Sequence, residues 1–144
     1  MFAPDFDYFR AGSVAEAGEL LAKYPGAKLL AGGHSLIPLL KLRLAAPAAV
    51  IDIGRITELR GITTNDGLTI GALTTHAELA ESGEVKQHAE ALAEAASQVG
   101  DPAVRNRGTI GGNIAHADPA SDLPTVLAAL GATVNIVGSD GERS

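Results

Sequence analysis

The spacing of hydrophobic and polar positions predicts short helices that alternate with short strands. Apolar residues recur at helical spacing over residues 14–21, and Ser13 followed by Glu16 has the pattern of a capping box. Pro25-Gly26 is expected to end this helix. The apolar run 27–31 then predicts a buried strand that leads into a pair of glycines.

The rest of the first third predicts a loop, a short helix and another strand. Residues 34–44 contain Pro38, which disfavours a long strand and suits a loop that passes into a short helix. Residues 48–53 are rich in β-branched side chains and predict a second strand.

The remainder of the chain opens with a hairpin pattern and continues mainly with helices. Asn65-Asp66-Gly67 between two apolar runs is typical of a hairpin turn. Thr75 and Glu78 form a second capping-box pattern, which predicts a helix over 76–80. Further predicted elements are one helix over 84–99 ended by Gly100-Asp101-Pro102, a helix from Ser121 or Asp122 through Leu130, and a strand over 132–137.

The change of pattern after residue 55 predicts two lobes, 1–55 and 56–144. Residues 138–144 look like a hairpin turn with no strand after it. We therefore expect the second lobe to be incomplete and residues 132–137 to lack a partner strand. Because an open strand edge can pair with another chain, self-association through it is expected.

Composition and charge exclude several classes of protein. The 144 residues carry 11 Lys and Arg against 17 Asp and Glu, a net charge of −6, without the clustered cations that nucleic-acid binding needs. Cysteine is absent, which excludes disulfides and cysteine-ligated zinc or iron–sulfur clusters within this chain. The N-terminus has no signal-peptide pattern and no apolar stretch reaches about 18 residues, so we expect a cytoplasmic protein without a membrane span.

Two glycine pairs are the strongest candidates for ligand binding among the 17 glycines of the chain. They lie within Ala31-Gly32-Gly33-His34-Ser35-Leu36 and within Thr109-Ile110-Gly111-Gly112-Asn113. Glycine allows positive φ and close approach, so consecutive backbone N–H groups can form an anion-binding nest. The alternative is that each pair is only a tight turn, and neither matches the GxGxxG or P-loop motifs.

Several other polar residues can be interpreted in two ways. His116 and Asp118 could ligate a metal, but no HxxxH or HxE spacing accompanies them, which favours a structural histidine and no metal site. Asp118, Ser121 and Asp122 could supply an acid–base pair, although the neighbouring prolines favour helix capping or a contact with a sugar.

Three sequence motifs together resemble a known family. AGGHSLIPLLKLR, GALTTHAEL and VRNRGTIGGNIAHADPASDLP resemble, in order and spacing, the FAD-binding medium subunit of molybdenum-containing hydroxylases. That family includes aerobic carbon monoxide dehydrogenase and xanthine dehydrogenase, and the resemblance runs from Met1 to about Val137. It implies an α+β fold of the vanillyl-alcohol oxidase and p-cresol methylhydroxylase type, with two FAD-binding subdomains. The second would be incomplete here, and the family's C-terminal domain would be absent.

The resemblance implies that residues of all three motifs bind FAD. In the family the first motif surrounds the FAD pyrophosphate, the third forms a second phosphate-side loop, and an aspartate contacts the ribose or adenine side. The residues at the matching positions are Ala31, Gly32, Gly33, His34, Ser35, Leu36, Thr75, His76, Thr109, Ile110, Gly111, Gly112, Asn113 and Asp122.

The resemblance also implies a function in electron transfer. In the family, substrate is oxidised at a molybdenum centre in a large subunit, and electrons pass through [2Fe–2S] clusters of a small subunit to FAD and on to an external acceptor. This chain would supply the flavin step, with those two subunits as partners and no catalytic residue of its own. The alternatives are an interaction module that binds no FAD, or a different flavoenzyme such as the reductase that completes UDP-N-acetylmuramate.

Overall fold

The computed structural model describes residues 2–138 and 141–144, and the contacts within the chain divide it into two units. The first unit comprises Met1–Thr57 together with Thr133–Ser144, and the second comprises Glu58–Ala132. The first boundary lies two residues beyond the one expected from the sequence. The C-terminal segment is grouped with the first unit, whereas the sequence pattern assigned it to the second lobe.

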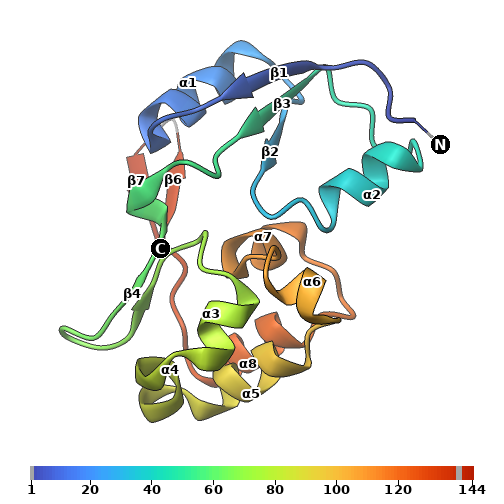
Figure 1. Ribbon diagram of the computed structural model, residues 1–144. Coiled ribbons are helices and arrows are strands. Elements are labelled where there is room, and N and C mark those ends of the chain that lie inside the picture. The colour runs from blue at the N-terminus through green and yellow to red at the C-terminus, as the bar shows by residue number, and fades with distance from the viewer. Residues whose placement is uncertain (1, 139–140) are drawn as a thin grey trace. The chain divides into compact units, whose positions relative to one another are not determined.

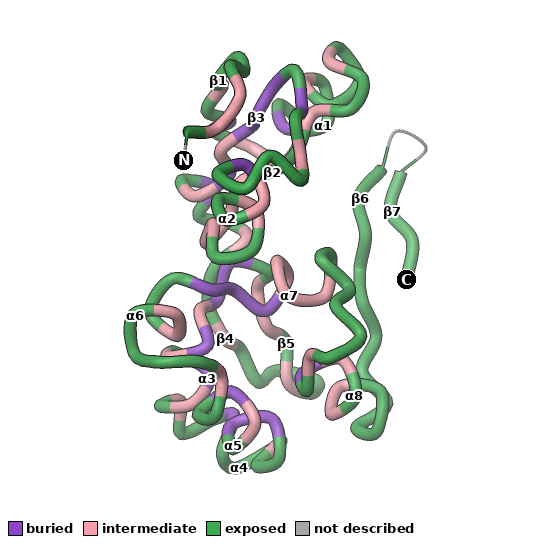
Figure 2. The backbone as a smooth tube through the Cα atoms, turned by 90° about the vertical axis from the view of Figure 1, so that its right-hand side faces the viewer, coloured by how far each residue is buried: buried purple, intermediate pink, exposed green. Residues whose placement is uncertain are grey.

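The first unit is built on a parallel sheet of three strands (Figure 1). Its order is β1 (Asp7–Arg10), β3 (Ala49–Asp52), β2 (Lys28–Leu30), and α1 (Val14–Lys23) makes the crossover between β1 and β2. The central strand β3 is buried, as Figure 2 shows, whereas β2 lies at the edge and Leu29 is 42% exposed. The prediction of a strand near residues 27–31 is confirmed, but the expectation that it is buried is wrong because β2 has a neighbour on one side only.

Two helices connect the three strands along the chain, and both begin close to where the sequence pattern predicts. The hydroxyl of Ser13 caps α1 by accepting from the N–H of Glu16 at 3.1 Å, while the Glu16 carboxylate accepts from the N–H of Gly12 at 2.7 Å. The short helix α2 (Leu36–Lys41) follows the first glycine pair. Pro38 lies in its first turn, where the missing N–H costs no helical hydrogen bond.

A two-stranded hairpin lies near the C-terminus. Strand β6 (Ile136–Gly138) pairs antiparallel with β7 (Gly141–Arg143), with Ile136 opposite Arg143. The expectation that residues 132–137 have no partner strand is therefore wrong for Ile136 and Val137, because the chain itself returns. The sequence pattern predicted a turn over residues 138–144, of which residues 141–143 form β7 and residues 139–140 lie outside the described residues. Both strands are exposed along their length, as Figure 2 shows.

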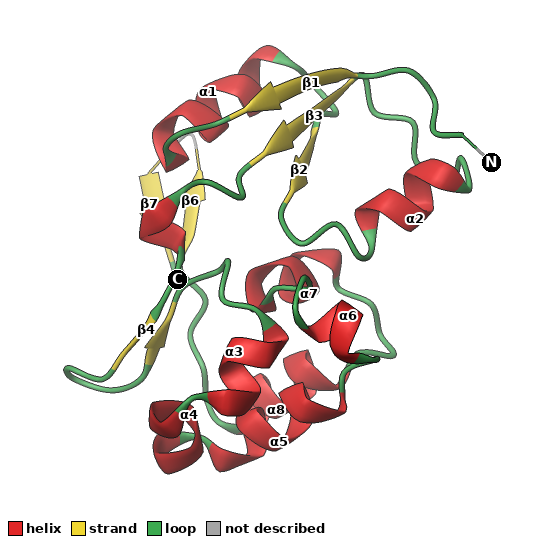
Figure 3. Cartoon of the chain, viewed as in Figure 1, coloured by secondary structure: helices red, strands yellow, loops and turns green. Residues whose placement is uncertain are grey.

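The second unit contains a small hairpin and six helices among the described residues (Figure 3). The 3-10 turn η1 (Thr57–Leu59) leads into it, and β4 (Ile62–Thr63) pairs antiparallel with β5 (Thr69–Ile70), as the turn residues predict. The helices are α3 (His76–Glu81), α4 (Gly83–His88), α5 (Glu90–Gln98), α6 (Pro102–Arg105), α7 (Ile110–His116) and α8 (Asp122–Ala129). None of the helices in the described ranges is long and apolar enough to cross a membrane.

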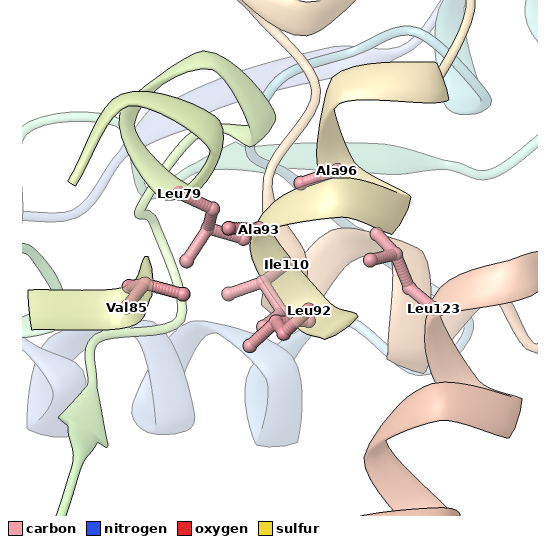
Figure 4. Packing of buried hydrophobic residues seen from close by; sticks show 7 residues of the cluster. All are labelled: Leu79, Val85, Leu92, Ala93, Ala96, Ile110 and Leu123. Carbon is pink, nitrogen blue, oxygen red and sulfur yellow. The ribbon is translucent and has the colours of Figure 1, made fainter. Parts of the chain in front are cut away.

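The core of the second unit is a cluster of buried apolar side chains from five helices (Figure 4). Its members are Leu79, Val85, Leu92, Ala93, Ala96, Ile110 and Leu123. The prediction of one helix over 84–99 is wrong, because Ala89 leaves the helical conformation (φ −151°, ψ 58°) and separates α4 from α5. The break allows both helices to bury apolar residues in the same cluster, and burial of each leucine contributes about 2 kcal/mol.

Candidate functional site

The first candidate loop, residues 31–36, follows directly from the edge strand β2. Gly33 has φ +80°, a conformation that costs other residues about 1–2 kcal/mol. A Cβ atom on Gly33 would lie 2.7 Å from Cδ1 of Ile37, so the loop also passes close to its own helix. Ser35 occupies the N-cap position of α2, but its hydroxyl makes no capping hydrogen bond. Glycine is therefore favoured at position 33 both by its positive φ and by the lack of space for a side chain.

This loop presents a row of unpaired backbone donors. Among the residues that the structure describes, the N–H groups of residues 32–36 donate to no backbone or side-chain acceptor of the chain. Gly32, Gly33 and Leu36 are half-buried, while His34 and Ser35 are exposed. Backbone N–H groups need an acceptor, and successive free donors are suited to an anion such as a phosphate.

The charge of the surrounding segment favours the same kind of ligand. Residues 20–51 contain Lys23, Lys28, Lys41 and Arg43 but no Asp or Glu, although the whole chain has a net charge of −6. This local excess of positive charge could have been found in the sequence by counting charges segment by segment. Positive charge close to the loop in sequence is expected to favour an anion bound to these N–H groups.

The second candidate loop, residues 109–113, uses its backbone differently. The N–H of Ile110 donates to the carbonyl of Thr74 at 3.0 Å, and that of Gly111 donates to the carbonyl of Ala72 at 2.9 Å. The N–H of Gly112 donates to Oγ1 of Thr109 at 3.2 Å. These donors are already paired within the second unit, so this glycine pair is not a nest of free N–H groups like the first.

The glycines at positions 108 and 111 are explained by close packing within the second unit. A Cβ atom on Gly111 would lie 2.6 Å from the Cβ of Ala72 and 2.8 Å from its carbonyl oxygen. A Cβ atom on Gly108 would lie 2.8 Å from Cδ2 of His76. Thr75 and Thr109 form an antiparallel bridge, which holds the segment 72–76 against 108–111. The structure therefore brings the predicted residues Thr75 and His76 together with the start of the 109–113 loop.

Thr75 and His76 both lie at the start of α3, and both side chains face groups of the chain itself. The hydroxyl of Thr75 accepts from the N–H of Glu78 and donates to the Glu78 carboxylate, which also accepts from the N–H of Thr75. His76 is 3% exposed, and its Nδ1 is the single buried side-chain nitrogen or oxygen without a partner within the described ranges. Burial lowers the pKa of this histidine.

The polar side chains near the end of the third motif differ in whether they are hydrogen-bonded within the chain. The Ser121 hydroxyl donates to Oδ1 of Asn113 at 2.8 Å, which links α7 to the start of α8. Asp122 is exposed in the first turn of α8. Asp118 accepts from the N–H of Ala120 at 2.9 Å, as in a turn. In the described part of the chain, no three His, Asp or Glu side chains lie together as metal ligands, so His116 and Asp118 form no such group.

A polar cluster on the sheet of the first unit was missed in the sequence. The hydroxyl of Tyr8 donates to Oδ2 of Asp52, whose Oδ1 accepts from the N–H of Gly54 at 2.8 Å. Arg10 lies 3.6 Å from the same carboxylate. Partial burial opposes ionisation of Asp52, but the Tyr8 and Gly54 hydrogen bonds and Arg10 outweigh it and lower its pKa. Alternation of Tyr8 and Arg10 along one strand was the signal that could have indicated this cluster.

These observations describe a mixed helix and strand chain in which one glycine loop has backbone N–H groups without an acceptor among the described residues. The chain belongs to the family described as FAD binding domain in molybdopterin dehydrogenase, which it matches over residues 4–144. FAD is the cofactor that the description of this family names. The resemblance found in the sequence and the cofactor that it implied are thus confirmed.

Curated relatives are subunits of oxidoreductases. The chain is 45% identical to the glyceraldehyde dehydrogenase medium chain of Sulfolobus acidocaldarius, with 100% of this chain and 52% of that protein covered. It is 48% identical to the carbon monoxide dehydrogenase medium chain of Hydrogenophaga pseudoflava, with 100% of this chain and 51% of that protein covered. Identity to the xanthine dehydrogenase FAD-binding subunit of Escherichia coli O157:H7 is 39%, with 94% of this chain and 47% of that protein covered. The chain therefore spans about half the length of these relatives.

Solved structures of such enzymes show the same fold. A carbon monoxide dehydrogenase from Hydrogenophaga pseudoflava that lacks the Mo-pyranopterin moiety matches with a TM-score of 0.96 at 49% identity, over 99% of this chain and 50% of that one. Quinoline 2-oxidoreductase from Pseudomonas putida 86 matches with a TM-score of 0.96 at 40% identity, over the same shares. These matches confirm the mixed helix and strand architecture that the resemblance implied.

Proposed function

We propose that this chain binds FAD and that residues 32–36 hold the pyrophosphate of the cofactor. The row of N–H groups without acceptors in the described chain carries this proposal. A bound pyrophosphate would give these donors charged acceptors, and hydrogen bonds to charged groups are stronger than those to water or to neutral groups. The positive charge of residues 20–51 supports the assignment, because it offsets the net negative charge of the chain.

In the second unit, the side chains of Asn113 and Asp122 are the best candidates for contacts with FAD. Asn113 is half-buried and Asp122 is exposed, so both can reach a ligand. A carboxylate such as that of Asp122 accepts hydrogen bonds and suits ribose hydroxyls rather than phosphates. Ile110 and Thr109 are 4% and 6% exposed, and we assign them to the packing of α7.

The biochemical role that fits this cofactor is electron transfer within a molybdenum hydroxylase. FAD supplies the redox chemistry, and the protein supplies binding, orientation and control of solvent access. We propose that the chain forms part of a medium subunit that accepts electrons from [2Fe–2S] clusters of a small subunit, alongside a molybdenum-containing large subunit. Relatives named as medium chains support this assignment, as does the fold, for which we propose the vanillyl-alcohol oxidase type with two FAD-binding subdomains.

Titration of the chain with FAD, followed by quenching of flavin fluorescence, tests the proposal. Gly33→Ala is the test variant, because a Cβ atom here would force Ile37 and the loop to move. Gly26→Ala is a matched control in the same unit, because Gly26 has φ +82° against +80° for Gly33 but no atom within 4 Å of the position that a Cβ would occupy. The two variants place alanine at nearly the same positive φ, so they carry similar backbone strain. They differ in that only the alanine at position 33 collides with Ile37 in the candidate loop.

We expect saturable quenching with the unaltered chain and with Gly26→Ala. Gly33→Ala should weaken FAD binding by about tenfold or more, which corresponds to at least about 1.4 kcal/mol. A folded chain that shows no saturable quenching would contradict the proposal and favour the alternative of an interaction module that binds no FAD. Equal affinities of the two variants would place the pyrophosphate elsewhere.

A further inference from the structure

Ser121 has an unusual hydrogen bond for a residue at the start of a helix. It occupies the N-cap position of α8, where a serine oxygen normally accepts from a backbone N–H two or three residues ahead. Its hydroxyl makes no such bond and instead donates to Oδ1 of Asn113, eight residues earlier, at 2.8 Å.

The other hydroxyl N-caps of the second unit behave in the usual way. Thr75, Ser82 and Thr109 each accept from the N–H three residues ahead, of Glu78, Val85 and Gly112 respectively. Ser121 is therefore the exception among the hydroxyl N-caps of this unit within the described residues. Where a residue departs from its local structural role, the cause is often functional.

The consequence of this hydrogen bond is the orientation of the Asn113 amide. An amide has one oxygen that accepts and one NH2 group that donates two hydrogens. Because the Ser121 hydroxyl donates to Oδ1, the Nδ2 donors of Asn113 are left for another partner. Nδ2 of Asn113 has no hydrogen-bond partner in the described chain. Among the described residues, the only side-chain nitrogen or oxygen that is both buried and without a partner is Nδ1 of His76. Nδ2 of Asn113 is therefore accessible to solvent.

We propose that Ser121 is a positioning residue that turns the Nδ2 donors of Asn113 toward FAD. The inference rests on the proposed function, in which Asn113 contacts the cofactor. With the opposite orientation Asn113 would present an oxygen, which repels phosphate and cannot donate to a flavin carbonyl. Ser121 thus acts on binding through Asn113 and need not touch the cofactor itself.

The inference is tested by FAD titration and urea denaturation of Ser121→Ala, Ser121→Thr, Asn113→Ala and the double variant Ser121→Ala/Asn113→Ala. Ser121→Ala should weaken FAD binding about three- to tenfold, the range expected from one hydrogen bond. Ser121→Thr retains the hydroxyl and should restore the affinity. The double variant should bind no more weakly than Asn113→Ala, because Ser121 acts only through that amide.

Ser82→Ala is the matched control, since Ser82 makes a true capping bond in the same unit. We expect Ser82→Ala to lower the urea midpoint and leave the FAD affinity unchanged. Ser121→Ala also removes a hydrogen bond, between α7 and α8, so a weaker affinity for FAD is what should distinguish it from Ser82→Ala. Unchanged affinity in Ser121→Ala, or a further loss in the double variant beyond Asn113→Ala, would overturn the positioning role while leaving the proposed function intact. Absence of FAD binding by the unaltered chain would overturn both.

Discussion

Gly111 and Ala72 approach so closely that a side chain on the glycine would overlap the backbone of the alanine. The N–H of Gly111 donates to the carbonyl of Ala72 at 2.9 Å, and a Cβ atom on Gly111 would lie 2.8 Å from that oxygen. The start of α7 is thereby fixed on the segment that precedes α3. The second glycine pair therefore contributes to the architecture of the second unit, whether or not its residues also contact a ligand.

Gly111→Ala should destabilise the second unit by about 1–3 kcal/mol, because the new methyl group meets backbone rather than a movable side chain. Gly83→Ala is the control, since Gly83 is also helical but has open space at its Cβ position. That change should be neutral or stabilising by up to about 1 kcal/mol. Urea denaturation of the two variants measures both effects. Equal free energies of unfolding would show that the close approach of Gly111 to Ala72 does not exclude a side chain at position 111.

The local features of the fold could be predicted from sequence, and the long-range ones could not. The starts of α1 and α3 were predicted correctly because Ser13 and Thr75 bond to residues only three positions ahead. The break at Ala89 was missed because apolar residues on both sides keep helical spacing, and only packing against the shared core requires two helices.

The same distinction applies to the candidate site. The glycine pairs were recognised as places where the backbone turns or packs closely, and Gly33 and Gly111 meet those conditions. Which pair has free N–H groups could not be predicted, because it depends on Ala72 and Thr74 accepting hydrogen bonds from α7 across the unit. The Tyr8–Asp52 bond likewise joins strands 44 residues apart in sequence.

His76 should make the second unit sensitive to acid. Burial lowers its pKa below the ordinary value of 6.5, so the unfolded chain binds a proton more readily than the folded chain as pH falls below that value. Stability is therefore lost toward low pH, by at most about 1.4 kcal/mol per pH unit. His76→Gln should reduce this loss between pH 7 and pH 5, while replacement of the exposed His88 by Gln serves as the control. Identical pH profiles for the chain and His76→Gln would refute the assignment.

Tyr8→Phe should destabilise the first unit by about 1 kcal/mol at pH 7, because it removes a hydrogen bond to the partly exposed Asp52 carboxylate. The pKa of Asp52 lies below its ordinary value of 3.8 in the folded chain. The stabilisation is thus present above that value and lost as pH falls through the folded pKa, so the variant and the unaltered chain should converge in acid. Tyr24→Phe is the control, because it removes a phenol hydroxyl that is not bonded to Asp52, and it should change stability by less than about 0.5 kcal/mol.

Thr75→Ala should lower the free energy of unfolding by about 1 kcal/mol, because it removes the hydroxyl that accepts from the N–H of Glu78 and donates to the Glu78 carboxylate. The backbone N–H of residue 75 can still donate to that carboxylate, so the other half of the capping box remains. Thr75→Ser keeps the hydroxyl and should retain most of the stability. The sequence resemblance placed Thr75 among the FAD ligands, yet its hydroxyl already donates to and accepts from Glu78. We therefore expect Thr75→Ala to change the urea midpoint and leave the FAD affinity of the folded protein within about twofold. A larger loss of affinity, restored by Thr75→Ser, would instead assign the Thr75 hydroxyl to the cofactor site.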